Sequence, residues 1–275
     1  MTVLFDLASG GTPPVERRTI LDDLRRPGAL RIEFQPIFRF NGERRELYAV
    51  EALTRGPRGT SMERPDVLFE YARRKGEETQ IDLLCIAAAL AEAVMLPDAP
   101  RISLNIHGST IGHTPGFTRL LLDSARAFGI GPDRLMLEIL EHRAGWADSI
   151  RGTLEELRAA GVLIALDDLG VGASNYHMLI DCRPDHLKID RYIVAGCSRD
   201  RYRAAVLQSI VTLGRASEAT PIAEGVEDLD DLRTLRSLGI DCVQGWLYAR
   251  SMPAADLAST AYLNPRHPAA PESDR

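Results

Sequence analysis

Side chains that can bind metal ions or move protons follow several short apolar runs in this chain. One run ends in Glu138, another in Asp167 and Asp168, and a third in Glu224. Apolar runs of this length bounded by loops are typical of fully buried parallel strands. A carboxylate inside such a strand is costly to leave unpaired, whereas one at its last residue can point into a shared cavity and hold a metal. Other polar residues in comparable places are Glu51, Asn105, Lys188 and Asp190. The pattern predicts a metal-dependent active site at the mouth of a β/α barrel.

The adjacent pair Asp167 and Asp168 is the centre of this predicted site. Neighbours within a strand point to opposite faces, so both can line one cavity only where the pleat stops. Two adjacent carboxylates repel unless cations lie between them, which suits a ligand that bridges two metals. The alternative is an acidic pair at a helix N-terminus. Gly170 and Gly172 directly after the pair favour a shaped loop instead.

The remaining candidate ligands are all oxygen donors. Glu51, Asn105 and Glu138 would complete one metal site, and Glu224 with Asp190 nearby would serve a second. All-oxygen ligation suits Mg²⁺ or Mn²⁺ better than zinc. Taken singly, the two glutamates could be salt-bridge partners and Asn105 a turn former.

Lysine is scarce in this chain, which draws attention to Lys188. Only Lys75 and Lys188 occur among 33 lysine and arginine residues. An ammonium group is a compact point charge with rotatable donors, unlike the planar guanidinium. Lys188 at a buried strand end is therefore interpreted as functional, and Lys75 as a surface residue.

The elements that must position these residues follow from apolar periodicity. Eight predicted strands give an α/β fold of the (β/α)8 TIM-barrel type. They span residues 31–40, 46–53, 101–106, 134–139, 162–166, 186–189, 221–223 and 242–243. Predicted helices span residues 19–26, 65–75, 79–95, 117–128, 147–160, 175–180, 201–217, 229–238 and 254–262. The pair Asn41-Gly42 is a strong hairpin signal, so the irregular first strand is expected to run antiparallel to the others.

Composition bounds the class of protein. The 275 residues, 45% hydrophobic and 26% charged, suit one large soluble domain over residues 18–263. Residues 1–17 are predicted to be a flexible leader and residues 264–275 a disordered tail. A net charge of −6 argues against binding of DNA or RNA duplexes or of anionic membranes. No membrane span and no signal peptide are expected, and cysteines without zinc spacing indicate a reducing cytoplasm.

The candidate residues also fall into motifs that resemble those of EAL domains, bacterial phosphodiesterases that open cyclic di-GMP. The resemblance runs from Phe34 to Pro253. Its motifs, in order, are Glu51-Ala52-Leu53 with Arg55, Glu138-x-x-Glu141, Asp167-Asp168-x-Gly170-x-Gly172, Lys188-Ile189-Asp190, Glu224-Gly225-Val226-Glu227 and Gln244-Gly245. EAL domains are barrels with one reversed strand, which agrees with the hairpin signal.

The resemblance implies a cytoplasmic homodimer that hydrolyses cyclic di-GMP to linear pGpG. Two divalent cations, Mg²⁺ or Mn²⁺, would activate the attacking water. Glu51, Lys188 and Glu224 are the expected catalytic residues, with Lys188 steadying the water or the developing charge. With no sensory or cyclase domain expected in the chain, control would come from a regulatory partner protein, dimerisation, expression or supply of metal and substrate.

Contacts to the substrate are expected from Arg55, which can pair with a phosphate, and from the amides of Gln35 and Gln244. The alternative for Gln35 is a hydrogen bond at the end of the barrel. Glu227 lies three residues after Glu224, on what is expected to be a starting helix. It is therefore expected to orient the ligands rather than bind metal.

The chain departs from the family in one loop. Leu140 replaces the Thr of the E-x-T-E motif, and Leu169 and Val171 replace Phe and Thr of D-D-F-G-T-G. In this family the second glutamate, here Glu141, anchors the loop that links the active site to the dimer interface. The altered loop supports one alternative, a receptor that binds cyclic di-GMP without cutting it. A separate alternative is an unrelated two-metal barrel hydrolase.

Overall fold

The computed structural model describes residues 20–26, 28–97, 100–140, 147–169 and 175–260. The predicted leader, the predicted tail, Glu141, Gly170 and Gly172 lie outside these residues.

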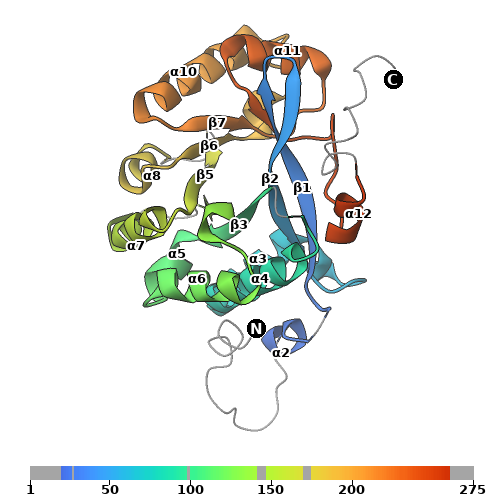
Figure 1. Cartoon of the computed structure of the whole chain (residues 1–275), viewed down its shortest axis with the longest axis vertical. Coiled ribbons are helices and arrows are strands. Elements are labelled where there is room, and N and C mark those ends of the chain that lie inside the picture. Colours follow the sequence, from blue (N-terminus) through green and yellow to red (C-terminus); the bar gives the residue numbers. More distant parts are fainter. Residues whose placement is uncertain (1–19, 27, 98–99, 141–146, 170–174, 261–275) are drawn as a thin grey trace.

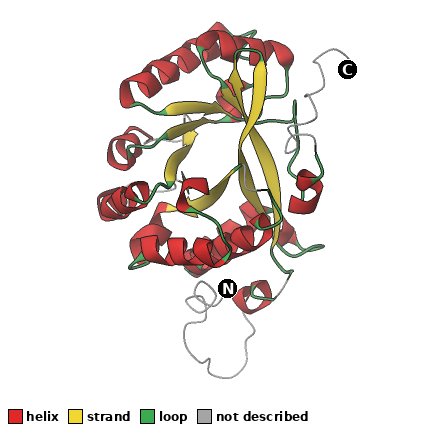
Figure 2. Ribbon diagram, viewed as in Figure 1, coloured by secondary structure: helices red, strands yellow, loops and turns green. Residues whose placement is uncertain are grey.

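The strands close into one barrel in the order β1-β2-β3-β4-β5-β6-β7-β8. Helices lie around the outside of the barrel (Figures 1 and 2). The strands are β1 Arg31–Asn41, β2 Arg44–Arg55, β3 Arg101–His107, β4 Leu135–Leu140, β5 Leu163–Leu169, β6 His186–Ile189, β7 Thr220–Ala223 and β8 Cys242–Val243. The predicted TIM-type barrel is confirmed.

The first strand is the reversed one, as the hairpin signal predicts. β1 pairs antiparallel with both β2 and β8, whereas every other neighbouring pair is parallel. Asn41 pairs with Arg44, so the loop is Gly42-Glu43, one residue later than the Asn-Gly pair suggests. Gly42 has φ +58, which only glycine adopts easily.

Most predicted helices occur within a few residues of their expected bounds. They are α2 Ile20–Leu24, α3 Pro65–Lys75, α4 Glu78–Ala93, α6 Phe117–Ala127, α7 Ala147–Ala159, α8 Asn175–Cys182, α10 Arg201–Ser217, α11 Leu229–Leu238 and α12 Ala254–Ala258. Two short helices were not predicted, α5 Gly108–His113 and α9 Arg191–Val194. Six and four residues are too few for an apolar period to show.

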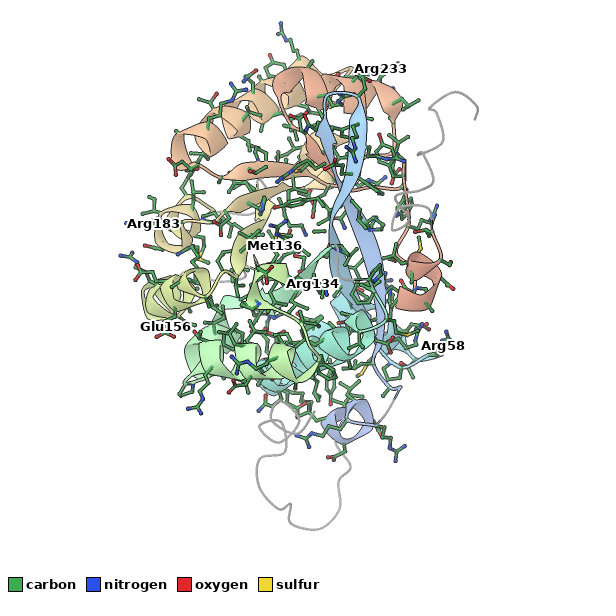
Figure 3. The ribbon with its side chains drawn as sticks, viewed as in Figure 1. Arg58, Arg134, Met136, Glu156, Arg183 and Arg233 are labelled. Atoms are coloured by element: carbon green, nitrogen blue, oxygen red, sulfur yellow. The ribbon has the colours of Figure 1, made fainter. Side chains whose placement is uncertain are left out.

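Two apolar layers hold the barrel together. Its interior is filled by small and medium side chains, among them Ile37, Met136 and Ile222. A larger cluster packs the outer faces of the strands against the helices. Figure 3 shows Met136 among the strands, while Arg58, Arg183 and Arg233 lie at the periphery. The interior beneath the mouth is thus a largely apolar packed core.

Within the described ranges, no helix has both the length and the apolarity needed to cross a membrane.

Two helical glycines provide a test of this packing. A Cβ added at Gly214 in α10 would lie 2.6 Å from the Ala219 carbonyl oxygen, whereas one at Gly152 in α7 would meet nothing within 4 Å. Gly152→Ala should raise the free energy of unfolding by about 0.5–1 kcal/mol by removing backbone freedom. Gly214→Ala should lower it by about 1–3 kcal/mol, because backbone must move. Urea denaturation of both variants measures the difference, and equal stabilisation would contradict the described α10–β7 packing.

Candidate active site

Four carboxylates surround the ammonium group of Lys188 in the mouth of the barrel. Lys188 Nζ lies 2.5 Å from Glu138 Oε2 and 2.6 Å from Glu224 Oε1. It lies 3.3 Å from Asp167 Oδ1 and 3.5 Å from Glu51 Oε2. The Lys188 side chain is only 1% exposed, so the sequence-based expectation of a buried lysine is confirmed. One ammonium group cannot balance four carboxylates, and the cluster carries excess negative charge.

Amide side chains orient Glu51. Asn105 Nδ2 donates to Glu51 Oε1 at 3.0 Å, and Gln244 Nε2 donates to Glu51 Oε2 at 2.7 Å. Gln244 Nε2 also lies 3.1 Å from Gln35 Oε1, and Gln35 Nε2 donates to the Ala249 carbonyl. The proposed alternative for Gln35, a hydrogen bond at the barrel end, therefore describes its contacts in this structure.

Glu138 is fixed by Ser103, a residue that the sequence reasoning missed. The Ser103 hydroxyl donates to Glu138 Oε1 while Lys188 contacts Oε2. The signal was available, because Ser103 stands two residues before Asn105 and alternate strand residues share a face.

The pKa values of the cluster reflect burial and charge. Burial raises the pKa of Glu138 to about 8, with a further contribution from the neighbouring charge of Glu51. Burial would also raise the pKa of Glu51, but the charge of Lys188 and the amide hydrogen bonds outweigh it and lower that pKa. Protons and cations therefore compete for the same oxygens.

Burial acts in the opposite direction on Lys188, whose charged form it disfavours. The charges of Asp167, Glu138 and Glu224 outweigh burial and hold the pKa of Lys188 well above its ordinary value. Burial likewise holds the pKa of Glu224 well above its ordinary value, although Lys188 opposes this. Lys188 therefore remains a cation throughout the neutral range.

The expectation that the ligands stand at the ends of strands is wrong for several of them. Glu51, Glu138 and the pair Asp167-Asp168 lie inside β2, β4 and β5. Inward-facing positions of a closed barrel already share one cavity, so the strand need not end there. At Asp167-Asp168 the register between β5 and β6 shifts, a β-bulge that re-aims side chains without ending the strand. The side chain of Asp168 itself is not described.

Glu227 lines the mouth cavity, and both Glu227 and Asp190 have hydrogen-bond partners outside the carboxylate cluster. Glu227 was expected on a starting helix, which is wrong, because α11 begins at Leu229 with Asp228 as its N-cap. Glu227 Oε2 instead accepts from Arg191 at 3.0 Å. Asp190 caps α9 by accepting from the Tyr192 amide at 2.7 Å. Roles for both in holding or orienting metal remain predictions.

Two cavities share Glu51 as a lining residue. The mouth cavity, about 240 Å³, is lined by Asp167, Lys188 and Glu224 together with Gln35, Glu51, Arg191, Gly225, Glu227, Gln244, Gly245 and Trp246. The side cavity, about 420 Å³, lies between β2, β3, α3 and α4, and Asn105 and Arg55 line it. Arg55 is held there by Glu33, 3.1 Å away, and by Ser251.

Of the residues that depart from the family, Leu140 ends β4 and lines the side cavity. Leu169 was expected in the loop, but it is the buried last residue of β5, paired with Ile189. Val171 lies outside the described residues.

The side chains of the mouth are of the chemical type that binds a hard divalent cation. Carboxylate oxygens and the Asn105 amide supply only oxygen, and the buried Asp167 Oδ1 makes no hydrogen bond. Within the described part of the chain, however, no three His, Cys, Asp or Glu side chains form a ready-made metal site. The carboxylates are gathered round Lys188 instead.

A barrel with one reversed strand and a carboxylate–lysine centre in its mouth defines a known class of domain. The EAL domain family model matches residues 17–251, and the chain belongs to this family.

Relatives and solved structures agree with this membership. The probable cyclic di-GMP phosphodiesterase PdeA of Escherichia coli is 30% identical over 243 residues, 87% of this chain and 32% of PdeA. An uncharacterized signaling protein of Caulobacter vibrioides is 32% identical over 93% of this chain and 32% of its own length. The chain thus spans about a third of these curated relatives.

Among solved structures, BlrP1 of Klebsiella pneumoniae in a manganese and cyclic di-GMP complex has a TM-score of 0.73 at 30% identity, covering 83% of this chain and 57% of that one. The PaMucR phosphodiesterase in its c-di-GMP complex has a TM-score of 0.72 at 30% identity, covering 83% of this chain and 99% of that one.

The two lysines allow a test of the centre. Lys188→Met should lower the free energy of unfolding in chelator by about 3–5 kcal/mol, because it leaves buried carboxylates unpaired. Added Mn²⁺ should restore part of this loss. Lys75→Met, which changes an exposed lysine, should be within about 0.5 kcal/mol of the parent protein. Thermal and urea denaturation measure both; a Lys188→Met protein as stable as the control would contradict the described ion pairs.

Proposed function

We propose that this chain is a divalent-metal-dependent phosphodiesterase that hydrolyses cyclic di-GMP to linear pGpG. The observation that carries the proposal is the buried centre of four carboxylates around Lys188, with the Asn105 amide beside it. Family membership, and the names of PdeA, BlrP1 and PaMucR, support the choice of substrate.

The residues that would hold two Mg²⁺ or Mn²⁺ ions are the oxygen donors of the mouth. They are Glu51, Asn105, Glu138, Asp167, Asp168, Asp190 and Glu224. The bound cations would supply a water of lowered pKa and positive charge opposite the phosphate. Gln244 would keep Glu51 in one orientation through its 2.7 Å hydrogen bond.

Lys188 would stabilise the negative charge that develops on the phosphate oxygens during attack. Its raised pKa keeps Nζ protonated, so its donors are available at neutral pH. When metal occupies the carboxylates, Nζ would be free to donate to the attacking water or to a phosphate oxygen. A fixed cation in a site that excludes water is worth more than one in solvent.

The direct test is incubation of the purified protein with cyclic di-GMP and Mg²⁺ or Mn²⁺, followed by chromatographic separation of pGpG. Turnover should require one of these ions and should fall in Ca²⁺, whose irregular coordination positions water poorly. Glu51→Ala should abolish turnover. Glu156→Ala, at an exposed position on α7 visible at the periphery of Figure 3, should leave it unchanged.

Full turnover in excess chelator, or near-parental turnover by Glu51→Ala, would contradict the metal assignment. Binding of intact cyclic di-GMP with no pGpG under any of these ions would instead favour the receptor alternative.

We further propose that the chain forms a homodimer through the face of α8. Tyr176 and Ile180, one helical turn apart, are 71% and 67% exposed there. Exposed apolar side chains at this spacing form one stripe that a second copy can cover.

Light scattering should give the mass of a dimer, and Ile180→Asp should shift it toward the monomer. Met95→Asp, which changes another exposed apolar residue, just after α4, is the control and should remain dimeric. A monomeric parent protein would rule out the dimer.

A further inference from the structure

Trp246 forms part of the wall of the mouth cavity. It is 51% exposed, and it lines the same cavity as Lys188, Asp167 and Glu224. Single exposed apolar residues are common and need no explanation by themselves. Tyr176, Tyr192 and Tyr202 are also largely exposed, but they line neither the mouth cavity nor the side cavity. The position of Trp246 therefore distinguishes it.

The backbone that carries Trp246 is locked in place. Val226 N donates to the Gln244 carbonyl at 3.0 Å, and Leu247 N donates to the Val226 carbonyl at 3.0 Å. Gly245 packs so closely on Val226 that an added Cβ would lie 2.0 Å from the Val226 carbonyl oxygen. The residues on both sides of Trp246 are thus tied to the segment that follows Glu224. An exposed ring on such a rigid turn loses little entropy when a ligand binds.

Two arginine side chains place positive charge beside the Trp246 ring. The Arg250 guanidinium carbon lies 3.9 Å from the Trp246 ring centroid, and that of Arg191 lies 5.9 Å away. Arg191 is itself fixed by Glu227, and its methylene groups pack against Gly225, where an added Cβ would come within 2.5 Å. This wall of the mouth cavity therefore presents an aromatic ring and two guanidinium groups next to the carboxylate centre.

We propose that Trp246 is the stacking platform for a purine base of the cyclic dinucleotide, on the Glu224 side of the mouth. The inference rests on the proposed function and deepens it. Every base offers a π-face to an aromatic ring, and larger purines gain more contact area than pyrimidines. Arg191 and Arg250 add attraction for the phosphates that flank the stacked nucleoside. Trp246 thereby favours purine rings, while recognition of guanine edges is left to polar groups.

The test is equilibrium binding of cyclic di-GMP by calorimetry in Ca²⁺, with product separation to confirm that the ligand stays intact. Trp246→Ala should weaken binding roughly 5- to 100-fold, the loss expected for one base–aromatic stack. Trp246→Phe keeps a ring and should recover most of the affinity. Tyr202→Ala, which removes an exposed ring 4.9 Å from an arginine on α10, is the matched control and should bind as the parent protein does. The loss in Trp246→Ala should be smaller for cyclic di-UMP.

A second measurement uses the native ring and does not depend on the folding of the alanine variant. In a Trp146→Phe background Trp246 is the remaining tryptophan, and stacking of guanine should quench its fluorescence as the site saturates. Parental affinity in Trp246→Ala, or saturation without quenching, would overturn the platform while leaving the proposed function intact. Absence of cyclic di-GMP binding and hydrolysis by the parent protein would overturn both.

Discussion

The burial of one ammonium group among four carboxylates is the interaction on which the mouth of this barrel depends. Lys188 lies in β6, and the acids come from β2, β4, β5 and the residue after β7, so the cluster joins strands that are far apart in the sequence. Buried charges of this kind persist only when paired and hydrogen-bonded. The centre is therefore supported by Ser103, Asn105 and Gln244, which donate to two of the acids. The excess negative charge that remains is what an additional cation would neutralise.

The reversed first strand contributes directly to this support. The hairpin register places Gln35 opposite Glu51, and Gln35 accepts from Gln244, which donates to Glu51. A slip of one residue would turn Gln35 away from the interior, because successive strand residues face opposite sides. The loop at Gly42-Glu43 and the bulge between Ile37 and Phe38 together set this register, and with it the environment of Glu51. The reversed strand β1 therefore helps to position Glu51, a residue of the candidate active site.

The sequence predicted what depends on local chemistry and periodicity. The hairpin, the parallel strands and the residues gathered round Lys188 all follow from turn residues and short apolar runs. Prediction from the sequence was wrong where contacts with a neighbouring segment determine where a strand or helix begins or ends. Leu169 extends β5 because β6 offers a partner in Ile189, and Glu227 remains outside α11 because Asp228 caps that helix. Ser103 was missed although its spacing to Asn105 places both on one face of the strand, because a lone serine does not reveal that its hydroxyl donates to Glu138 on the neighbouring strand.

The replacement of the family's Thr by Leu140 has a structural counterpart on the neighbouring strand. Leu140 pairs with His107, whose backbone amide and ring Nδ1 both lie 3.0 Å from the buried carboxylate of Asp82 in α4. Thr110 donates to the same carboxylate at 2.6 Å. The end of β3, two residues beyond Asn105, is therefore anchored to α4 through a charged acceptor, a stronger bond than one between neutral groups. Loss of a hydroxyl on β4 leaves the Asn105 side of the mouth in place, because its position is set from the helix behind it.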